Sequence, residues 1–228
     1  MQKLINSFLK LIKYPVAICS VVFAYPLFLG LIHLIGETFS MRLAIYFLLP
    51  IAGTAVLWYV IPGLAGSPLT IFAHEATHML AAVLTFHKPT GMNIVEDKGG
   101  SFSYAGKGNW FITIAPYFVP TFPLIWMIVG LFLKQPFETW YIFSYGFLVG
   151  FHISANLTQM HVQQPDFKKA GWIFTILFIP SANMLCAGYL WCFALKGWSG
   201  LSLWNHYMAT GTHESIKELS LWVHRLIG

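Results

Sequence analysis

One apolar stretch, residues 68–86, contains two histidines and a glutamate, and this combination limits what the chain can fold into. The stretch is long enough to cross most of a bilayer as a helix. Ionisable side chains are costly there, so they indicate a functional site. They form the pattern His-Glu-Ala-Thr-His. On a helix, His74 and His78 share one face and can bind one zinc ion, and Glu75 is placed to act as a general base on zinc-bound water.

The composition is that of a polytopic membrane protein. Of 228 residues, 57% are hydrophobic and only 9% are charged, which excludes an ordinary soluble domain. The formal net charge of +5 therefore concerns topology and lipid headgroups, and no nucleic-acid-binding motif accompanies it. The three scattered cysteines form no C-x-x-C pair, so they predict neither a disulfide framework nor a thiolate zinc site.

Hydropathy predicts an all-α membrane protein with about six transmembrane helices and a single membrane-embedded domain over 1–228. The expected spans are 15–36, 42–62, 68–86, 109–133, 138–160 and 169–195. Two flanking segments, 1–14 and 212–227, have apolar residues on one helical face and are predicted to be amphipathic helices. The catalytic core is expected within 68–172.

Local signals refine two of these spans. Ser67 is a suitable N-cap and Pro68 suits the first turn, so a helix should begin at this point. Three prolines, Pro116, Pro120 and Pro123, fall inside the expected fourth span, which should therefore be kinked or broken.

Polar residues follow the span that carries the histidines. Residues 92–95 and 101–104, separated by a Gly-containing turn, predict a short membrane-associated β-hairpin. One arm of this hairpin could hold an unwound substrate strand by edge pairing, and a purely structural hairpin is an equal alternative.

A catalytic zinc needs a third protein ligand and an open position for water. Asp166, between the expected fifth and sixth spans, is the preferred candidate, and its alternative role is the N-cap of the sixth span. His161 and Glu138 are further candidates. Asp97 lies in the hairpin turn, where aspartate is ordinary. The sequence thus predicts one zinc per chain held by His74, His78 and Asp166.

These residues together resemble the site-2 protease family of intramembrane zinc metalloproteases, over about residues 68–172. The shared features are the His-Glu-x-x-His pattern in a membrane helix and a Gly-rich hairpin, here residues 97–104. The family's Ala-Gly-Pro-x-x-Asn motif is represented by Ala115-Pro116, without the Gly and the Asn. Its second core motif is represented by Asn156 and Pro165-Asp166, without a Gly directly after the Asp.

The resemblance implies hydrolysis of a peptide bond in or near a transmembrane segment of a membrane-protein substrate. Glu75 would take a proton from zinc-bound water and return it to the leaving amine. Asn156 is the candidate donor to the oxyanion, with His152 one turn before it; a hydrogen bond between helices is the alternative role of each. The expected location is a prokaryotic cytoplasmic (inner) membrane, with a possible regulatory membrane partner.

Two other functions fit the same residues. A membrane metalloprotease of the prenyl-protein type would take its third ligand from a glutamate, Glu138 or Glu214. A proteolytically inactive membrane scaffold would bind zinc but would not hydrolyse peptide bonds. A di-iron oxygenase is disfavoured because it needs several clustered histidine boxes, and only His74 and His78 pair here.

Overall fold

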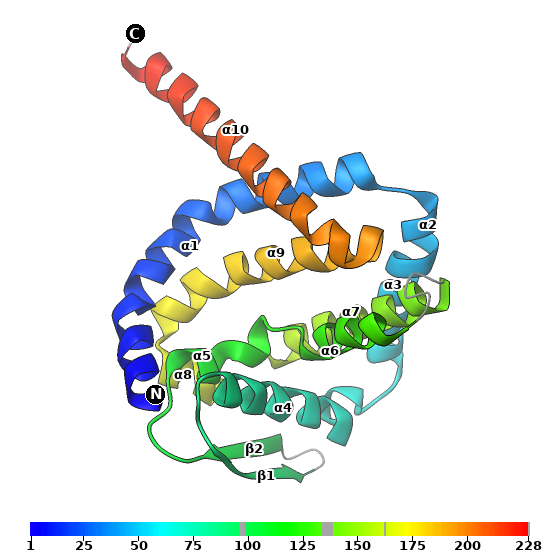
Figure 1. Ribbon diagram of the computed structural model, residues 1–228, viewed down its shortest axis with the longest axis vertical. Coiled ribbons are helices and arrows are strands. Elements are labelled where there is room, and N and C mark those ends of the chain that lie inside the picture. The colour runs from blue at the N-terminus through cyan, green and yellow to red at the C-terminus, as the bar shows by residue number, and fades with distance from the viewer. Residues whose placement is uncertain (96–98, 134–138, 162, 228) are drawn as a thin grey trace.

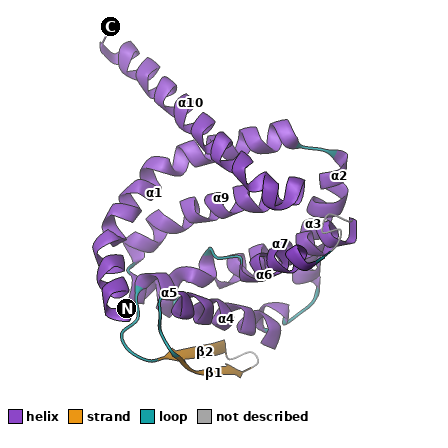
Figure 2. Ribbon diagram, viewed as in Figure 1, coloured by secondary structure: helices purple, strands orange, loops and turns teal. Residues whose placement is uncertain are grey.

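The protein is mostly helical, with one two-stranded sheet (Figures 1 and 2). The computed structural model describes residues 1–95, 99–133, 139–161 and 163–227. The helices are α1 (Gln2–Thr38), α2 (Met41–Leu43), α3 (Leu49–Val60), α4 (Pro68–Leu84), α5 (Trp110–Ile114), α6 (Thr121–Val129), α7 (Thr139–Gln159), α8 (Pro165–Ala170), α9 (Trp172–Lys196) and α10 (Leu201–Ile227). The strands are β1 (Pro89–Val95) and β2 (Gly99–Tyr104).

Three helical stretches are long and apolar enough to cross a membrane, and a fourth candidate is a bent pair. The three are Gln2–Thr38, Met41–Val60, in which a π-helical turn joins α2 to α3, and Trp172–Arg225, which includes α9 and α10. The described residues thus support a multi-pass membrane protein with three or four candidate spans rather than the expected six. Helix α4, with 17 residues, and helix α7, with 21 and several polar side chains, are not among these candidates.

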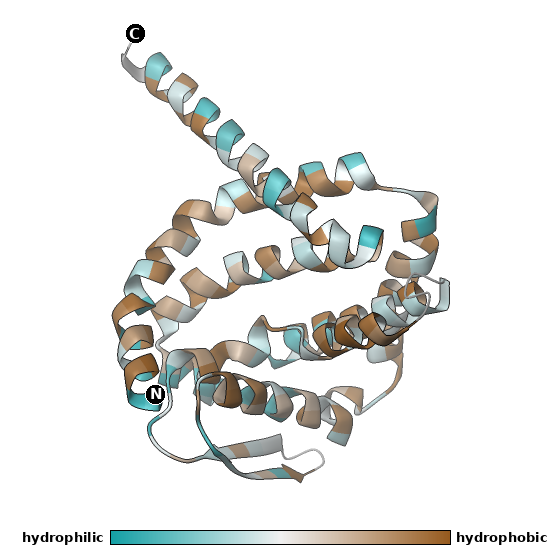
Figure 3. Ribbon diagram, viewed as in Figure 1, coloured by the Kyte–Doolittle hydropathy of each residue, from teal (hydrophilic) through white to brown (hydrophobic). Residues whose placement is uncertain are grey.

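Residues 1–14, predicted to be a surface helix, and the expected first span form one continuous helix. Helix α1 continues through Pro15 and Pro26 as one curved helix (Figure 1). Membrane helices tolerate proline because neighbouring groups satisfy the freed carbonyl, so neither proline ends this helix. Hydrophobic residues occur along its length (Figure 3), and exposed ones such as Ile18 and Val22 suit contact with lipid.

The C-terminal amphipathic segment also differs from the prediction. Helix α10 begins at Leu201 rather than near residue 212, directly after a 3₁₀ turn that follows α9. Its first half packs across α1, and its second half projects away from the body of the protein (Figure 1). The early start follows from the buried Trp204 and Tyr207, which belong to the core.

The expected fourth span is broken, as its prolines predict. Helix α5 continues into a 3₁₀ turn at Ala115–Tyr117, and α6 then starts at Thr121 with an 80° bend between the two parts. Pro116 and Pro120 lack the N–H groups that a continuous helix would need at these positions. The break brings Ile112 and Tyr117 beside α4 and α8, where the histidines lie.

Helix α4 begins where the sequence predicts. Ser67 is the N-cap, its hydroxyl accepts a hydrogen bond from the Thr70 N–H, and Pro68 occupies the first turn. The Thr70 hydroxyl donates to the Leu64 carbonyl at 2.8 Å, which ties the preceding turn to the helix. The cap therefore fixes where α4 starts, and with it the position of the histidines about two and three turns further on.

The predicted β-hairpin is confirmed. Strands β1 and β2 pair antiparallel, with Met92 opposite Phe102 and Val95 opposite Gly99, and both strands contact α4. The hairpin covers one side of α4 at the end of the molecule (Figure 1). Residues 96–98, including Asp97, lie outside the described residues.

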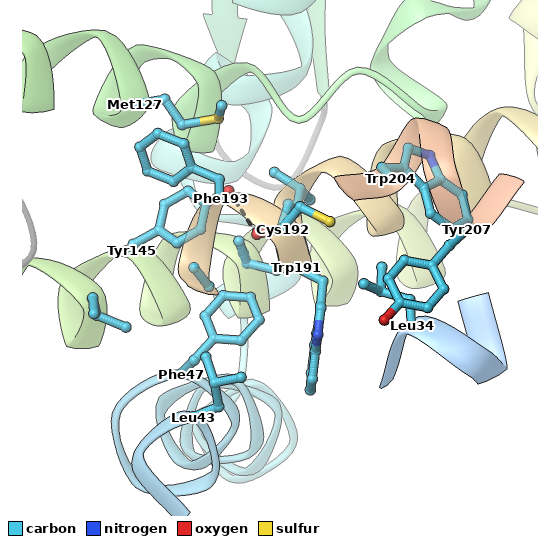
Figure 4. Packing of buried hydrophobic residues seen from close by; sticks show 14 of the residues in the cluster. Leu34, Leu43, Phe47, Met127, Tyr145, Trp191, Cys192, Phe193, Trp204 and Tyr207 are labelled. Atoms are coloured by element: carbon cyan, nitrogen blue, oxygen red, sulfur yellow. Dashed lines mark hydrogen bonds between the residues drawn. The ribbon is translucent and has the colours of Figure 1, made fainter. Parts of the chain in front are cut away.

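An aromatic core joins α1, α2 with the π-helical turn after it, α6, α7, α9 and α10 (Figure 4). Phe47 stacks on Tyr145 with ring centroids 5.7 Å apart, and Phe193 lies 5.1 Å from the same ring. Trp191 meets Phe47 edge-on. A second cluster, between α4, α5, α8 and α9, contains Tyr117 and borders the histidines. Side chains from several helices interlock in both clusters. The helices around the two histidines are therefore fixed relative to one another.

Close packing between α1 and α10 depends on two glycines. A Cβ atom at Gly30 would lie 2.6 Å from the Tyr207 carbonyl oxygen, and one at Gly211 would collide with the Pro26 carbonyl. Small residues at such crossings let two backbones approach each other, as in many membrane-helix pairs.

We expect Gly30→Ala to lower the free energy of unfolding by about 1–3 kcal/mol, because the added methyl group forces α1 and α10 apart. Gly36→Ala, in the same helix, is the matched control, since nothing lies within 4 Å of its Cβ position. The control should leave stability unchanged or raise it slightly, by up to about 1 kcal/mol. Thermal unfolding in detergent measures both, and equal effects of the two substitutions would contradict the close packing.

Candidate metal centre

Two histidines of α4 point their Nε2 atoms toward the same place. His74 and His78 are four residues apart, so they lie on one face of the helix, and their Nε2 atoms are 3.1 Å from each other. Both side chains are about nine-tenths buried. Each imidazole therefore presents one nitrogen to a common point within the protein.

Asp166 supplies a third atom at this point. Its Oδ2 lies 3.3 Å from His78 Nε2 and 3.6 Å from His74 Nε2, and the three potential ligand atoms lie within 4.8 Å of one another. Two nitrogens and one carboxylate oxygen are a common ligand set of catalytic zinc, which leaves a fourth position open. The donor set and its geometry thus fit a divalent metal such as zinc.

The alternative role of Asp166 as the cap of the sixth span is wrong. Asp166 lies inside the first turn of the short helix α8, whose N-cap is Gln164. The following long helix α9 begins at Trp172, after Gly171. Pro165 starts α8 early, because its fixed φ suits the first helical position, and this turns the aspartate toward α4.

Hydrogen bonds orient each imidazole from behind. His74 Nδ1 lies 2.8 Å from Gln159 Oε1, and His78 Nδ1 donates to the Ile112 carbonyl at 2.7 Å. A carbonyl oxygen can only accept, so the proton of neutral His78 lies on Nδ1 and its Nε2 lone pair is free. Such outer partners are the usual way in which a protein fixes the ring of a metal-binding histidine.

The carboxylate is held in the same way. The hydroxyl of Tyr117 donates to Asp166 Oδ2 at 3.2 Å, and Lys169 Nζ is 3.9 Å from Oδ1. Burial alone would raise the pKa of Asp166, but hydrogen bonds from His74 and His78, and their positive charge when these rings are protonated, lower it more, so it lies below its usual value. Asp166 is therefore a carboxylate at neutral pH, as a metal ligand must be.

Glu75 faces a cavity of about 510 Å³ that also contains His74, His78 and Asp166 on its wall. The side chain is only 6% exposed. Strand β2 closes the other side, and a Cβ at Gly100 would lie 2.8 Å from Glu75 Oε1. The cavity thus joins the predicted base to the three predicted ligands in one space.

The structure does not bring Asn156 into this cavity. Asn156 lines a separate space of about 30 Å³ behind His74, together with His152. Its Nδ2 is 3.1 Å from His152 Nε2, one turn earlier on α7. The role of Asn156 as an oxyanion donor therefore stays a prediction, and the observed contact of both residues is with each other.

The other predicted ligands lie elsewhere. His161 is exposed in the turn after α7 and is not part of the histidine–aspartate cluster. Glu214, the alternative for a prenyl-type enzyme, is on α10, and its Oε2 is 2.7 Å from His33 Nε2. Glu138, like Asp97, falls outside the described residues. Among the described residues, Asp166 is the carboxylate that reaches both histidines.

Sequence reasoning missed three supporting positions: Gln159, Tyr117 and the backbone of Ile112. Two weak signals pointed to them. Gln159 belongs to the polar run that leads from Asn156 to Asp166, and Tyr117 follows the Ala-Pro remnant of a family motif. The role of Ile112 has no side-chain signal, because its backbone carbonyl makes the contact.

Comparison with known proteins adds one finding to this geometry. The Peptidase M50B-like family matches residues 48–159, a range that includes α4, the hairpin and all of α7. The matched range contains the His-Glu-x-x-His pattern and ends before Asp166. No curated protein and no solved structure matches the chain.

We expect the purified protein to bind about one zinc ion and Asp166→Ala to bind it more than about 100-fold more weakly, because a ligand is lost and two imidazoles remain. Lys169→Ala is the matched control, since its ammonium only neighbours the outer carboxylate oxygen. Metal analysis and competition with a chelator measure both variants. Full zinc binding by Asp166→Ala would exclude this ligand set.

Proposed function

The chain belongs to the Peptidase M50B-like, or site-2 protease-like, family, and on this basis we propose that it is an intramembrane zinc metalloprotease. It would hydrolyse a peptide bond in or near a transmembrane segment of a membrane-protein substrate. One observation carries the proposal: Glu75 shares a cavity with His74, His78 and Asp166, whose ligand atoms converge within 4.8 Å. An acid–base group beside a three-ligand metal site is the minimum that this hydrolysis requires.

The residues divide into metal ligands and a base. His74, His78 and Asp166 would hold zinc, which when bound lowers the pKa of its water toward about 7. Glu75, the neighbour of His74 in sequence, would accept a proton from the attacking water and return it to the leaving amine. Its burial beneath β2 keeps the carboxylate beside the reacting atoms and away from bulk solvent.

The oxyanion needs a donor besides the metal. We retain Asn156 as the proposed donor, although its amide nitrogen is bonded to His152 in this conformation. Donation to a substrate would therefore require Asn156 to leave His152 and to reach the larger cavity, with which its own space shares the lining residues His74 and Gln159.

The substrate is proposed to bind as an unwound strand. A transmembrane helix hides its carbonyl groups in its own hydrogen bonds, so the cleaved region must unfold locally. Residues 99–102 and Tyr104 of β2 line the cavity opposite Glu75, and an extended segment could pair along this hairpin.

Glu75→Gln tests the proposal directly. It should abolish cleavage while zinc binding remains, because the amide cannot accept the proton but does not disturb the ligands. The measurement compares, by mass spectrometry, the N-termini of membrane proteins from cells that express either form. Wild type should create new termini within or beside apolar segments.

Glu218→Gln is the matched control for Glu75→Gln. Glu218 lies on α10 and accepts a hydrogen bond from the Tyr25 hydroxyl, which an amide oxygen can also do, so cleavage should be unchanged. Identical termini from wild type and Glu75→Gln would contradict proteolysis and favour the inactive zinc-binding scaffold.

A second substitution tests the role of the hairpin. Gly100→Ala should lower cleavage about 100-fold, because its methyl group would displace Glu75 or β2 by roughly an ångström. Gly91→Ala, on β1 with nothing within 4 Å of its Cβ position, is the control and should cleave normally. Full activity of Gly100→Ala would show that β2 does not fix the base.

A further inference from the structure

A single carboxamide connects the end of α7 to a predicted metal ligand. Gln159 is the last residue of α7, and its Oε1 lies 2.8 Å from His74 Nδ1. On the opposite side of the ring, His74 Nε2 faces His78 Nε2 at 3.1 Å and Asp166 Oδ2 at 3.6 Å. Gln159 therefore contacts Nδ1 of His74, whereas Nε2 faces the other two predicted metal ligands.

The chemistry of this contact determines where the imidazole proton lies. An amide oxygen is an acceptor, so Nδ1 must carry the proton and Nε2 must present its lone pair. The opposite orientation of the amide would donate to Nδ1, move the proton to Nε2 and block metal binding there. The Oε1 contact is thus the one that prepares His74 to bind a cation.

The position of Gln159 is fixed by its own surroundings. The side chain of Gln164 donates to the Gln159 carbonyl at 2.8 Å and closes the turn between α7 and α8. The Met160 N–H remains bonded to Asn156 as α7 ends. This turn leads directly to Asp166, so one short segment positions a ligand and the outer partner of another.

We propose that Gln159 is a positioning residue that fixes His74 as an Nε2 ligand of the metal. The inference rests on the metal centre of the proposed function and goes beyond it, because it assigns a role to a side chain outside the ligand set. Outer partners of this kind typically change metal affinity by about 10–100-fold.

The test measures zinc affinity by competition with a chromophoric chelator, on the full-length protein in detergent. Gln159→Leu keeps a side chain of similar size without the acceptor, and we expect its zinc dissociation constant to rise about 10–100-fold. Gln159→Glu restores an acceptor with added charge, and its affinity should equal or exceed that of wild type. Gln163→Leu, in the exposed part of the same turn, is the matched control and should bind as wild type does.

Cobalt substitution provides a second readout that a purely structural role would not change. The visible absorption of bound Co²⁺ depends on ligand identity and geometry, so Gln159→Leu should alter the spectrum while Gln163→Leu should not. Zinc affinity and cobalt spectrum of Gln159→Leu equal to those of wild type would overturn the proposal. The proposal would also be overturned if Gln159→Glu bound zinc more weakly than Gln159→Leu.

These outcomes separate the inference from the proposed function. If wild type binds zinc and cleaves, but Gln159→Leu matches it in affinity and spectrum, only the role of Gln159 falls. If wild type binds no zinc, the proposed function falls, and the positioning role falls with it.

Discussion

The ligand atoms of His74, His78 and Asp166 converge at one buried point, and the contacts of several other elements hold them there. His78 must hold its proton on Nδ1, because Nδ1 meets a carbonyl, and the same holds for His74 facing Gln159 Oε1. Both Nε2 atoms then point toward each other and toward the Asp166 carboxylate at 3.1–3.6 Å. Acceptors repel one another at this distance unless a proton or a metal cation lies between them, and a divalent metal can meet all three atoms at once.

The groups that contact the ligands from outside have the hydrogen-bonding character that a metal site needs. Acceptors meet the far side of each imidazole, whereas a donor, the Tyr117 hydroxyl, meets the carboxylate. Burying two imidazoles and two carboxylates is costly in an apolar chain, and hydrogen bonds from several elements compensate the cost. The partners come from α5, the turn after it, and α7, so the centre depends on the break in the fourth span and on the end of α7.

The features of the fold that depend on residues close together in the sequence could be predicted. The Ser67 cap, the proline break after α5 and the hairpin with arms at 92–95 and 101–104 each follow from a short motif whose physics is local. The continuity of α1 could not be predicted, because neighbouring helices decide whether Pro15 ends a helix. Three or four of the six expected spans are long and apolar enough to be candidates in the described residues, because α4 is short and α7 carries several polar side chains.

The candidate site divides in the same way. The two histidines and Glu75 are fixed by spacing within one helix, and their convergence needs no tertiary information. The meeting of Asp166 with them, and the contact of Gln159 with His74, require the chain to return from α7 through a specific turn. A backbone contact such as that of Ile112 leaves no mark on the sequence at all.

The turn between α7 and α8 also explains how a degenerate motif can still place its aspartate. The family's second motif has a glycine directly after the aspartate, and this chain has Phe167 there. Pro165 starts α8 one residue before Asp166, so a helical turn, rather than a flexible glycine, sets the direction of the carboxylate. Phe167 is buried against the Tyr117 ring at 4.6 Å, which anchors the same turn. Pro165 and the contact between Phe167 and Tyr117 thus orient Asp166, and a glycine after the aspartate is not needed for this.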